Sequence, residues 1–286
     1  MRISFDSIVP EESKLERLAT GFRFTEGPLW NSHKGFLLFS DIPANRIYKW
    51  SPDGGTSVFR EPTGNSNGLT YDRAGRLIIC EQGGRKLSCI EIDGTYTILA
   101  DKFQGRCLNS PNDVVVKSDG AIYFTDPPYG IRPEEQELPF QGVFRLDLEN
   151  EKLTLLLKDF IGPNGLAFSP DESILYIVDS SKERRHVRAF DVNPDGTLSN
   201  SRVFAEIRLE DRGPPDGMKV DIEGNLYVAA AGGIWIFSDE GENLGIIRTP
   251  EIPVNCAWGG DDWKSLFITA RTSLYRVKLS IPGIKV

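Results

Sequence analysis

The sequence predicts an all-β fold, a six-bladed β-propeller whose last blade is closed by the N-terminal strand. Three observations lead to this fold: a phrase that recurs along the chain, the strand pattern inside each recurrence, and an incomplete last copy. The phrase is clearest as NGLAFSPDESILYIVDS at residues 164–180. Its six copies begin 39 to 52 residues apart, at Glu26, Asn67, Asn112, Asn164, Asp216 and Asn255. A period of this length is typical of propellers and other repeat folds.

Each copy predicts four short strands. The first two are β-branched or aromatic runs on either side of a tight turn such as SDG, PDE or IEG. A third run follows, as in RIYKW or GVFRL, and a fourth usually ends the copy, as in TSVFR or YTILA. Four antiparallel strands repeated six times indicate a six-bladed propeller.

The last copy lacks its fourth strand, because SLYRVKLS is followed by only a few residues. A spare strand is predicted within SKLERLATGF (residues 13–22), ahead of the first copy. We expect this strand to pair with SLYRVKLS as the outer edge of the last blade, which closes the ring. Since no Pro/Gly/Ser-rich linker divides the sequence, residues 1–286 are predicted to be a single domain.

Composition narrows the class of protein. The net charge of −8 argues against nucleic-acid and anionic membrane partners. The N-terminus lacks a signal-peptide pattern, and no run of about 18 apolar residues occurs. The four cysteines have no CxxC spacing, so we expect reduced core thiols in a cytoplasmic protein. A disulfide between Cys80 and Cys89, on successive strands, is the alternative.

The propeller geometry brings six oxygen-bearing side chains together. If the first strand of each copy is innermost, all six run parallel along the central channel, and their opening residues meet at one end, the mouth. Because Asn and Asp are good turn residues, capping of strand starts is the structural alternative. Crowded carboxylates would repel each other and lose hydration, and a bound cation removes that cost. We therefore predict a metal site formed by this mouth ring, whose members are Glu26, Asn67, Asn112, Asn164, Asp216 and Asn255.

The donor atoms indicate which metal fits. All of them are oxygens, with no Cys or His in the ring. Hard ions such as calcium, magnesium or manganese suit oxygen donors, whereas softer ions such as zinc suit them less well. Calcium tolerates irregular cages with neutral amide oxygens, so one divalent ion, calcium first, is the expected cofactor.

A second set of residues is predicted around the mouth. The strand after each turn runs back to the mouth, so its end residues should form an outer ring. The connection after Asp126, PPYGIRPEEQELPFQG, is long enough to act as a lid, and its Tyr129 is expected to line the pocket. A solvated surface loop is the alternative for its acidic half. The expected outer-ring residues are Asp41, Glu81, Asp126, Asp179 and Arg271.

The scarcity of histidine and the lack of a nucleophile motif argue against one class of hydrolase. The two histidines, His33 and His186, lie in a turn and in the basic stretch ERRHVR, and no GxSxG occurs. A Ser-His-Asp hydrolase or a catalytic His dyad is therefore not predicted.

The phrases FTEGPLW, SPNDVVV with TDPPYG, GPNGLAFSPD and GPPDGM resemble the gluconolactonase/regucalcin (senescence marker protein)/luciferin-regenerating-enzyme family. TDPPYG is similar to the microbial gluconolactonase branch. The resemblance implies a six-bladed propeller with a divalent metal at the channel mouth. It further implies that Glu26, Asn164 and Asp216 are metal ligands, and that Asn112 contacts the metal or the substrate. Asp113 matches the family's second acidic residue near the metal.

Lactonases for sugar acids belong to this family, which implies metal-dependent opening of a lactone ring. The metal would polarise the lactone carbonyl, and a protein base is expected because calcium acidifies water less than zinc does. Asp216 is the first candidate for this base and Asp113 the second. Asn112, Tyr129 and Arg271 are the candidate substrate-binding residues.

Two other functions are compatible with the same motifs. A non-catalytic propeller that binds calcium or a partner would keep the same ligands. A phosphotriesterase-type hydrolase would use the same ion with another pocket. The phosphofluoridate-hydrolysing relatives use a His near the mouth of the last blade, and this sequence has Arg271 in that region, which argues against that second alternative.

Overall fold

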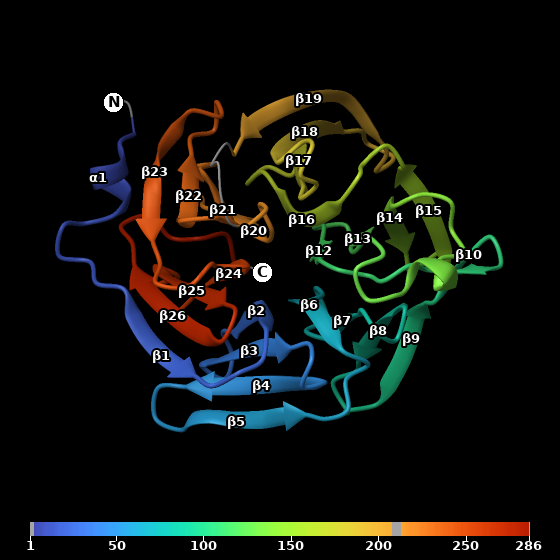
Figure 1. Cartoon of the computed structure of the whole chain (residues 1–286), viewed down its shortest axis with the longest axis horizontal. Coiled ribbons are helices and arrows are strands. Elements are labelled where there is room, and N and C mark those ends of the chain that lie inside the picture. Colours follow the sequence, from blue (N-terminus) through green and yellow to red (C-terminus); the bar gives the residue numbers. More distant parts are fainter. Residues whose placement is uncertain (1–2, 208–212, 286) are drawn as a thin grey trace.

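Six four-stranded antiparallel sheets surround a central channel in the computed structural model, which describes residues 3–207 and 213–285 (Figure 1). In five blades the strands follow chain order from the channel outwards. In the sixth, the N-terminal strand β1 is the outermost strand. The predicted six-bladed propeller and its closure by the N-terminus are thus confirmed.

The strands of blades 1 and 2 are β2 (Thr25–Asn31), β3 (Phe36–Asp41), β4 (Arg46–Ser51), β5 (Gly55–Arg60), β6 (Ser66–Tyr71), β7 (Leu77–Glu81), β8 (Lys86–Ile90) and β9 (Tyr96–Ala100). Those of blades 3 and 4 are β12 (Val114–Val116), β13 (Ile122–Asp126), β14 (Gly142–Asp147), β15 (Lys152–Leu157), β16 (Pro163–Phe168), β17 (Ile174–Asp179), β18 (His186–Val192) and β19 (Leu198–Glu206). Those of blades 5 and 6 are β20 (Met218–Val220), β21 (Leu226–Ala230), β22 (Gly233–Phe237), β23 (Asn243–Arg248), β24 (Asn255–Gly259), β25 (Ser265–Ala270), β26 (Ser273–Lys278) and β1 (Glu16–Thr20). Outside the blades are α1 (Phe5–Ile8), η1 (Pro133–Glu135) and the hairpin of β10 (Lys102–Phe103) and β11 (Arg106–Cys107).

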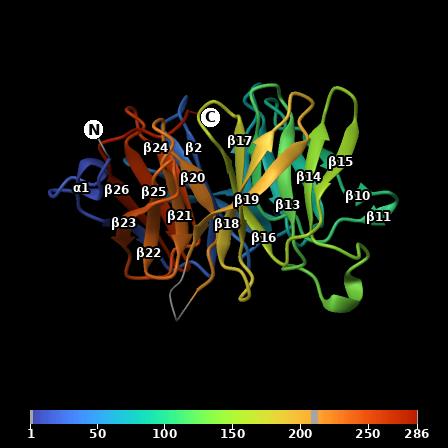
Figure 2. The same cartoon turned by 90° about the horizontal axis from the view of Figure 1, so that it is seen from above.

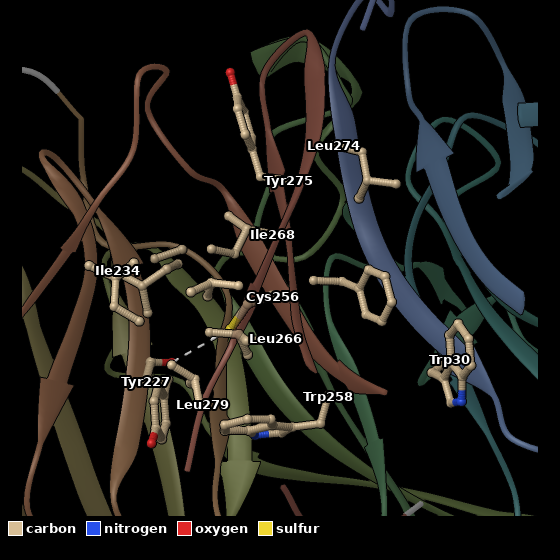
Figure 3. Packing of buried hydrophobic residues seen from close by; sticks show 14 of the residues in the cluster. Trp30, Tyr227, Ile234, Cys256, Trp258, Leu266, Ile268, Leu274, Tyr275 and Leu279 are labelled. Carbon is tan, nitrogen blue, oxygen red and sulfur yellow. Dashed lines mark hydrogen bonds between the residues drawn. The ribbon is translucent and has the colours of Figure 1, made fainter. Parts of the chain in front are cut away.

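The hydrophobic core lies between neighbouring blades. In the seam that joins blades 6 and 1, Trp30 stacks on Phe267, with ring centroids 5.3 Å apart and an interplanar angle of 13°. Figure 3 shows part of this cluster, in which Tyr227, Cys256 and Trp258 pack between β21 and β24. Because each blade is packed against two others, the inner strands are held firmly around the channel.

The ring closure is built from strand pairing and from burial of the N-terminal segment. β1 pairs antiparallel with β26, with Glu16 opposite Arg276 and Thr20 opposite Ser273. Ahead of β1, the side chain of Ile8 in α1 is fully buried in the same cluster. The closing strand is therefore anchored by packing as well as by its ladder.

Two inner strands begin later than the repeat predicts. β12 starts at Val114 and β20 at Met218, each two residues after its mouth-ring residue. The backbone nevertheless stays paired there, since Asn112 N–H donates to the Thr125 carbonyl and Asp216 N–H to the Ala229 carbonyl, both at 2.9 Å. The ring residues of these blades therefore keep the positions that the repeat implies.

The four cysteines are free thiols, as expected, and the alternative disulfide between Cys80 and Cys89 is not formed. Across the described ranges, α1 and η1 have only four and three residues, and neither these nor any other helix is long and apolar enough to cross a membrane.

Candidate metal and catalytic site

The mouth ring is assembled at the start of the six inner strands. Five of its members are buried, with exposures of 3% to 6% for Glu26, Asn67, Asn112, Asn164 and Asn255. Asp216 is half-buried, so it is the ring residue most open to solvent. Buried polar side chains in such a cluster need partners.

A glycine follows the ring residue in four of the blades, and neighbouring inner strands approach closely there. A Cβ on Gly27 would lie 2.1 Å from the Asn67 carbonyl oxygen, and one on Gly165 would lie 2.5 Å from that of Asp216. In blades 1, 2 and 4 the ladder register also shifts at this point, which marks a bulge. Bulges redirect side chains beside functional sites. Backbone crowding and bulges together therefore set the direction of the ring side chains.

The two ring carboxylates are electrostatically coupled. Loss of hydration raises the pKa of Glu26 to about 7, and the charge of Asp113 adds to this rise, whereas the Gly27 N–H and the Asn255 amide oppose it. Loss of hydration also raises the pKa of Asp216 well above its usual range, and the charges of Glu26 and Asp113 contribute. The Asn164 side chain beside Asp216 opposes that shift. Such crowding is the feature that a bound cation relieves.

Two ring carboxamides already have partners. The Asn67 amide donates to Gln82 Oε1 at 3.1 Å, and the Asn255 amide donates to Glu26 Oε2 at 3.1 Å. The Asn255 carbonyl oxygen accepts the Cys256 N–H at 2.8 Å. Asn67 and Asn255 therefore support the ring, whereas the Asn164 side chain lies beside Asp216, a member of the predicted ligand set. The repeat predicts neither the contact of Asn67 with Gln82 nor that of Asn255 with Glu26.

The donor set is mixed rather than a cluster of acids. Among residues 3–207 and 213–285, no three His, Cys, Asp or Glu side chains are placed to hold a metal ion. The set of Glu26, Asp216, Asn112 and Asn164 contains only two carboxylates. Carboxylate and amide oxygens are the donors that calcium accepts, so these residues fit a hard divalent ion.

Asp113 is a third carboxylate, buried beside the ring with 3% exposure. Its Oδ1 accepts the Val114 N–H at 2.9 Å, whereas its Oδ2 has no hydrogen-bond partner within the described structure. Loss of hydration raises its pKa, and the positive charge of Lys219 opposes this rise. Asp113 occupies the position that is glycine in four of the other blades. A Cβ on Gly68 of blade 2 would lie 2.8 Å from Asp113 Oδ1, so the carboxylate lies against the neighbouring inner strand.

The acids at the ends of the second strands have a structural role. Asp41 accepts the N–H groups of Arg23 and Phe24, at 2.9 and 3.1 Å. Asp126 accepts the N–H groups of Asn109 and Ser110. Asp179 accepts those of Ile161 and Gly162. These three carboxylates fix the loops that lead into the inner strands, and they are buried rather than open to the mouth. Glu81 instead accepts the hydroxyls of Ser88 and Tyr96.

Tyr129 and Arg271 lie on the same side of the propeller as the ring. The loop between β13 and β14 extends from one face, opposite the C terminus (Figure 2). A Cβ on Gly162 would lie 2.7 Å from the Tyr129 hydroxyl, so this side chain reaches blade 4. Lost hydration and the charge of Asp216 raise the pKa of Tyr129. Arg271 is exposed in the β25–β26 turn, and its carbonyl accepts the Thr25 N–H at 2.7 Å.

Known proteins share this fold over nearly the whole chain. A gluconolactonase of Zymomonas mobilis is 34% identical over 302 residues, which cover 97% of this chain and 85% of the relative. The structure of a gluconolactonase from Xanthomonas campestris superposes with a TM-score of 0.88 and 35% identity, covering 96% of this chain and 91% of the other. A calcium-binding regucalcin from Agrobacterium tumefaciens shares the fold, with a TM-score of 0.79, 19% identity and 94% of each chain covered.

The family profile described as "SMP-30/Gluconolactonase/LRE-like region" matches residues 24–272. This range includes the whole mouth ring and Asp113. The chain belongs to the SMP-30/gluconolactonase/LRE-like family.

Proposed function

We propose that this protein is a divalent-metal-dependent lactonase that opens the lactone ring of a sugar acid. The observation that carries the proposal is the mouth ring, where loss of hydration raises the pKa of both Glu26 and Asp216 and the charge of Asp113 adds to both shifts. The gluconolactonases among the similar proteins support the substrate class. A cytoplasmic site of action, supported by the four free thiols, and a single functional domain over residues 1–286 belong to the proposal.

Glu26, Asn112, Asn164 and Asp216 would hold the metal, with calcium preferred because every donor is an oxygen. When bound, the ion supplies a Lewis acid for the lactone carbonyl. Asp216 is the best-placed base because it is the ring carboxylate most open to solvent. Asp113 is the second candidate.

The substrate would be oriented by residues around the mouth. Asn112 would position the lactone carbonyl or a ring hydroxyl. Tyr129, which spans from the blade 3 loop to blade 4, and the exposed Arg271 would contact the sugar hydroxyls. The lactone is the expected partner, with no nucleic acid or membrane in the reaction.

The function is tested with a panel of hexono- and pentonolactones, assayed with chelator-treated and calcium-restored protein. We expect hydrolysis that chelation removes and calcium restores, with an acyclic ester of the same acid as the control substrate. Full activity after verified removal of metal would contradict metal dependence. Stoichiometric calcium binding without lactone hydrolysis would instead favour a binding propeller, and preferential phosphotriester hydrolysis would favour the other hydrolase class.

Metal affinity is expected to depend on pH. Because the folded-state pKa of Glu26 is about 7, a proton competes with the metal below neutrality, so calcium affinity should rise about tenfold between pH 6 and pH 8. The raised pKa of Glu26 has the opposite effect on the stability of the metal-free fold. Its stability should fall as pH rises from 4.5 through 7, since the folded state holds a proton that the unfolded chain has released. Calorimetric calcium titration and melting of the metal-free protein across this pH range check both pH dependences. A calcium affinity that does not change with pH would contradict the assignment of Glu26 as a ligand.

A further inference from the structure

One side chain connects the mouth ring to the loop between β13 and β14 (residues 127–141). Gln82 directly follows β7, at the mouth end of the second strand of blade 2. The amide of the ring residue Asn67 donates to Gln82 Oε1 at 3.1 Å. A Cβ on Gly130 of the β13–β14 loop would lie 2.5 Å from Gln82 Cγ, so the loop backbone packs directly on this side chain. Gln82 therefore lies between the ring and the loop, at the edge of the mouth.

The backbone of Gln82 is held on both sides. Its N–H donates to the Asn65 carbonyl at 3.2 Å. Its carbonyl accepts the Ser110 hydroxyl at 3.0 Å, and the same hydroxyl oxygen accepts the Gly130 N–H at 2.9 Å. A residue that packing and hydrogen bonds already fix loses little further freedom when it binds a ligand. The position of Gln82 is therefore set before a substrate binds.

The amide N–H groups of Gln82 are free for a ligand. A glutamine side chain has one acceptor oxygen and two N–H donors. Asn67 occupies the oxygen, whereas Nε2 donates to no acceptor among residues 3–207 and 213–285. The side chain is half-buried, and its Nε2 is open to solvent rather than enclosed. Two free donors on a fixed, uncharged side chain fit a ligand that is rich in neutral acceptor oxygens, such as hydroxyls.

We propose that Gln82 is a specificity-determining residue, whose amide donates to a hydroxyl oxygen of the sugar-acid lactone and so favours hydroxylated lactones over unsubstituted ones. This inference rests on the proposed function and adds a substrate contact to it. The β13–β14 loop supports the assignment, because the residue before Gly130 is Tyr129, the candidate substrate contact that reaches blade 4. The same short segment therefore packs on Gln82 and carries Tyr129.

The test uses Gln82→Met and Gln82→Glu. Methionine keeps a stem that can pack on Gly130 and removes the amide, whereas glutamate keeps an oxygen that can accept from Asn67 and removes both donors. At saturating calcium, kcat/KM for gluconolactone should fall roughly 3- to 12-fold in both variants, the usual effect of one neutral hydrogen bond. δ-Valerolactone has the same six-membered ring without hydroxyls, so its kcat/KM should stay at the wild-type value.

Binding without turnover provides a second measurement. Gluconolactam is an uncharged analogue of the lactone, and its amide resists hydrolysis. Calorimetric titration should show gluconolactam bound more weakly by both variants, by the same factor as the fall in kcat/KM. Calcium affinity should be unchanged in Gln82→Met, because Gln82 is not a proposed ligand.

Gln136→Met is the matched control. Gln136 is a half-buried glutamine of the same loop, and its Nε2 is already bonded to the Leu138 carbonyl at 2.9 Å. Its replacement should change neither kcat/KM nor lactam affinity. Wild-type values in Gln82→Glu would reduce Gln82 to a support for Asn67, and an equal fall for δ-valerolactone or in Gln136→Met would also overturn the proposal. If the wild-type protein binds gluconolactam but hydrolyses no lactone, the proposed function fails, and the lactam affinities alone decide the role of Gln82.

Discussion

Replacing Asp216 with asparagine is expected to reduce turnover by roughly 10³-fold or more and to weaken calcium binding in the same variant. The substitution removes a charged metal donor and the best-placed base together, and general base catalysis alone is usually worth roughly 10²–10⁴. Since asparagine keeps the size of the side chain and Asp216 is only half-buried, the propeller should remain folded. Turnover at saturating calcium, calorimetry and circular dichroism measure the three effects. Wild-type turnover and affinity would remove Asp216 from the site.

Asp113→Asn is the informative comparison for that experiment. The asparagine carbonyl oxygen can still accept the Val114 N–H, so the local backbone contact is retained. Because Asp113 lies beside the ring rather than in it, calcium affinity should change much less than in Asp216→Asn. A turnover loss of roughly 10²-fold or more with near-normal affinity would identify Asp113 as the base. A loss confined to metal affinity would make it a supporting residue, and normal values for both would leave Asp216 as the base.

The repeat predicted the architecture because each blade must bury the same faces. Six recurrences of one phrase predicted the six blades, and the missing fourth strand of the last copy predicted closure of the ring by β1. The mouth ring followed from the same argument, since equivalent residues of parallel inner strands must lie at one end of the channel. These predictions needed only periodicity and the direction of the strands.

Features that depend on contacts between blades could not be predicted in this way. Asp41 and Asp126 recur at strand ends like candidate site residues, but each accepts two backbone N–H groups of a preceding loop. Asn67 and Asn255 look equivalent to Asn112 and Asn164, yet their amides are bound to Gln82 and Glu26.

Loss of the closing strand is expected to have the largest effect on stability. Deleting residues 1–22 removes β1, which leaves the edge of β26 unpaired, and an open edge invites aggregation. It also removes Ile8 and Phe22, whose ring packs on Phe39 at a centroid distance of 5.0 Å. We expect poor recovery of folded protein or a melting temperature lowered by more than about 10 °C, because many kilocalories of packing and pairing are lost at once.

One further variant keeps this test decisive if the truncated chain cannot be purified. Ile8→Ala leaves β1 intact but opens a cavity where α1 docks, and since the Ile8 carbonyl accepts the Ser280 N–H at 2.9 Å, the segment should stay in place. A loss of about 2–5 kcal/mol is usual for such a core truncation, so melting several degrees lower is expected. Wild-type melting in Ile8→Ala and in the 1–22 deletion would mean that blade 6 is stable without its N-terminal strand.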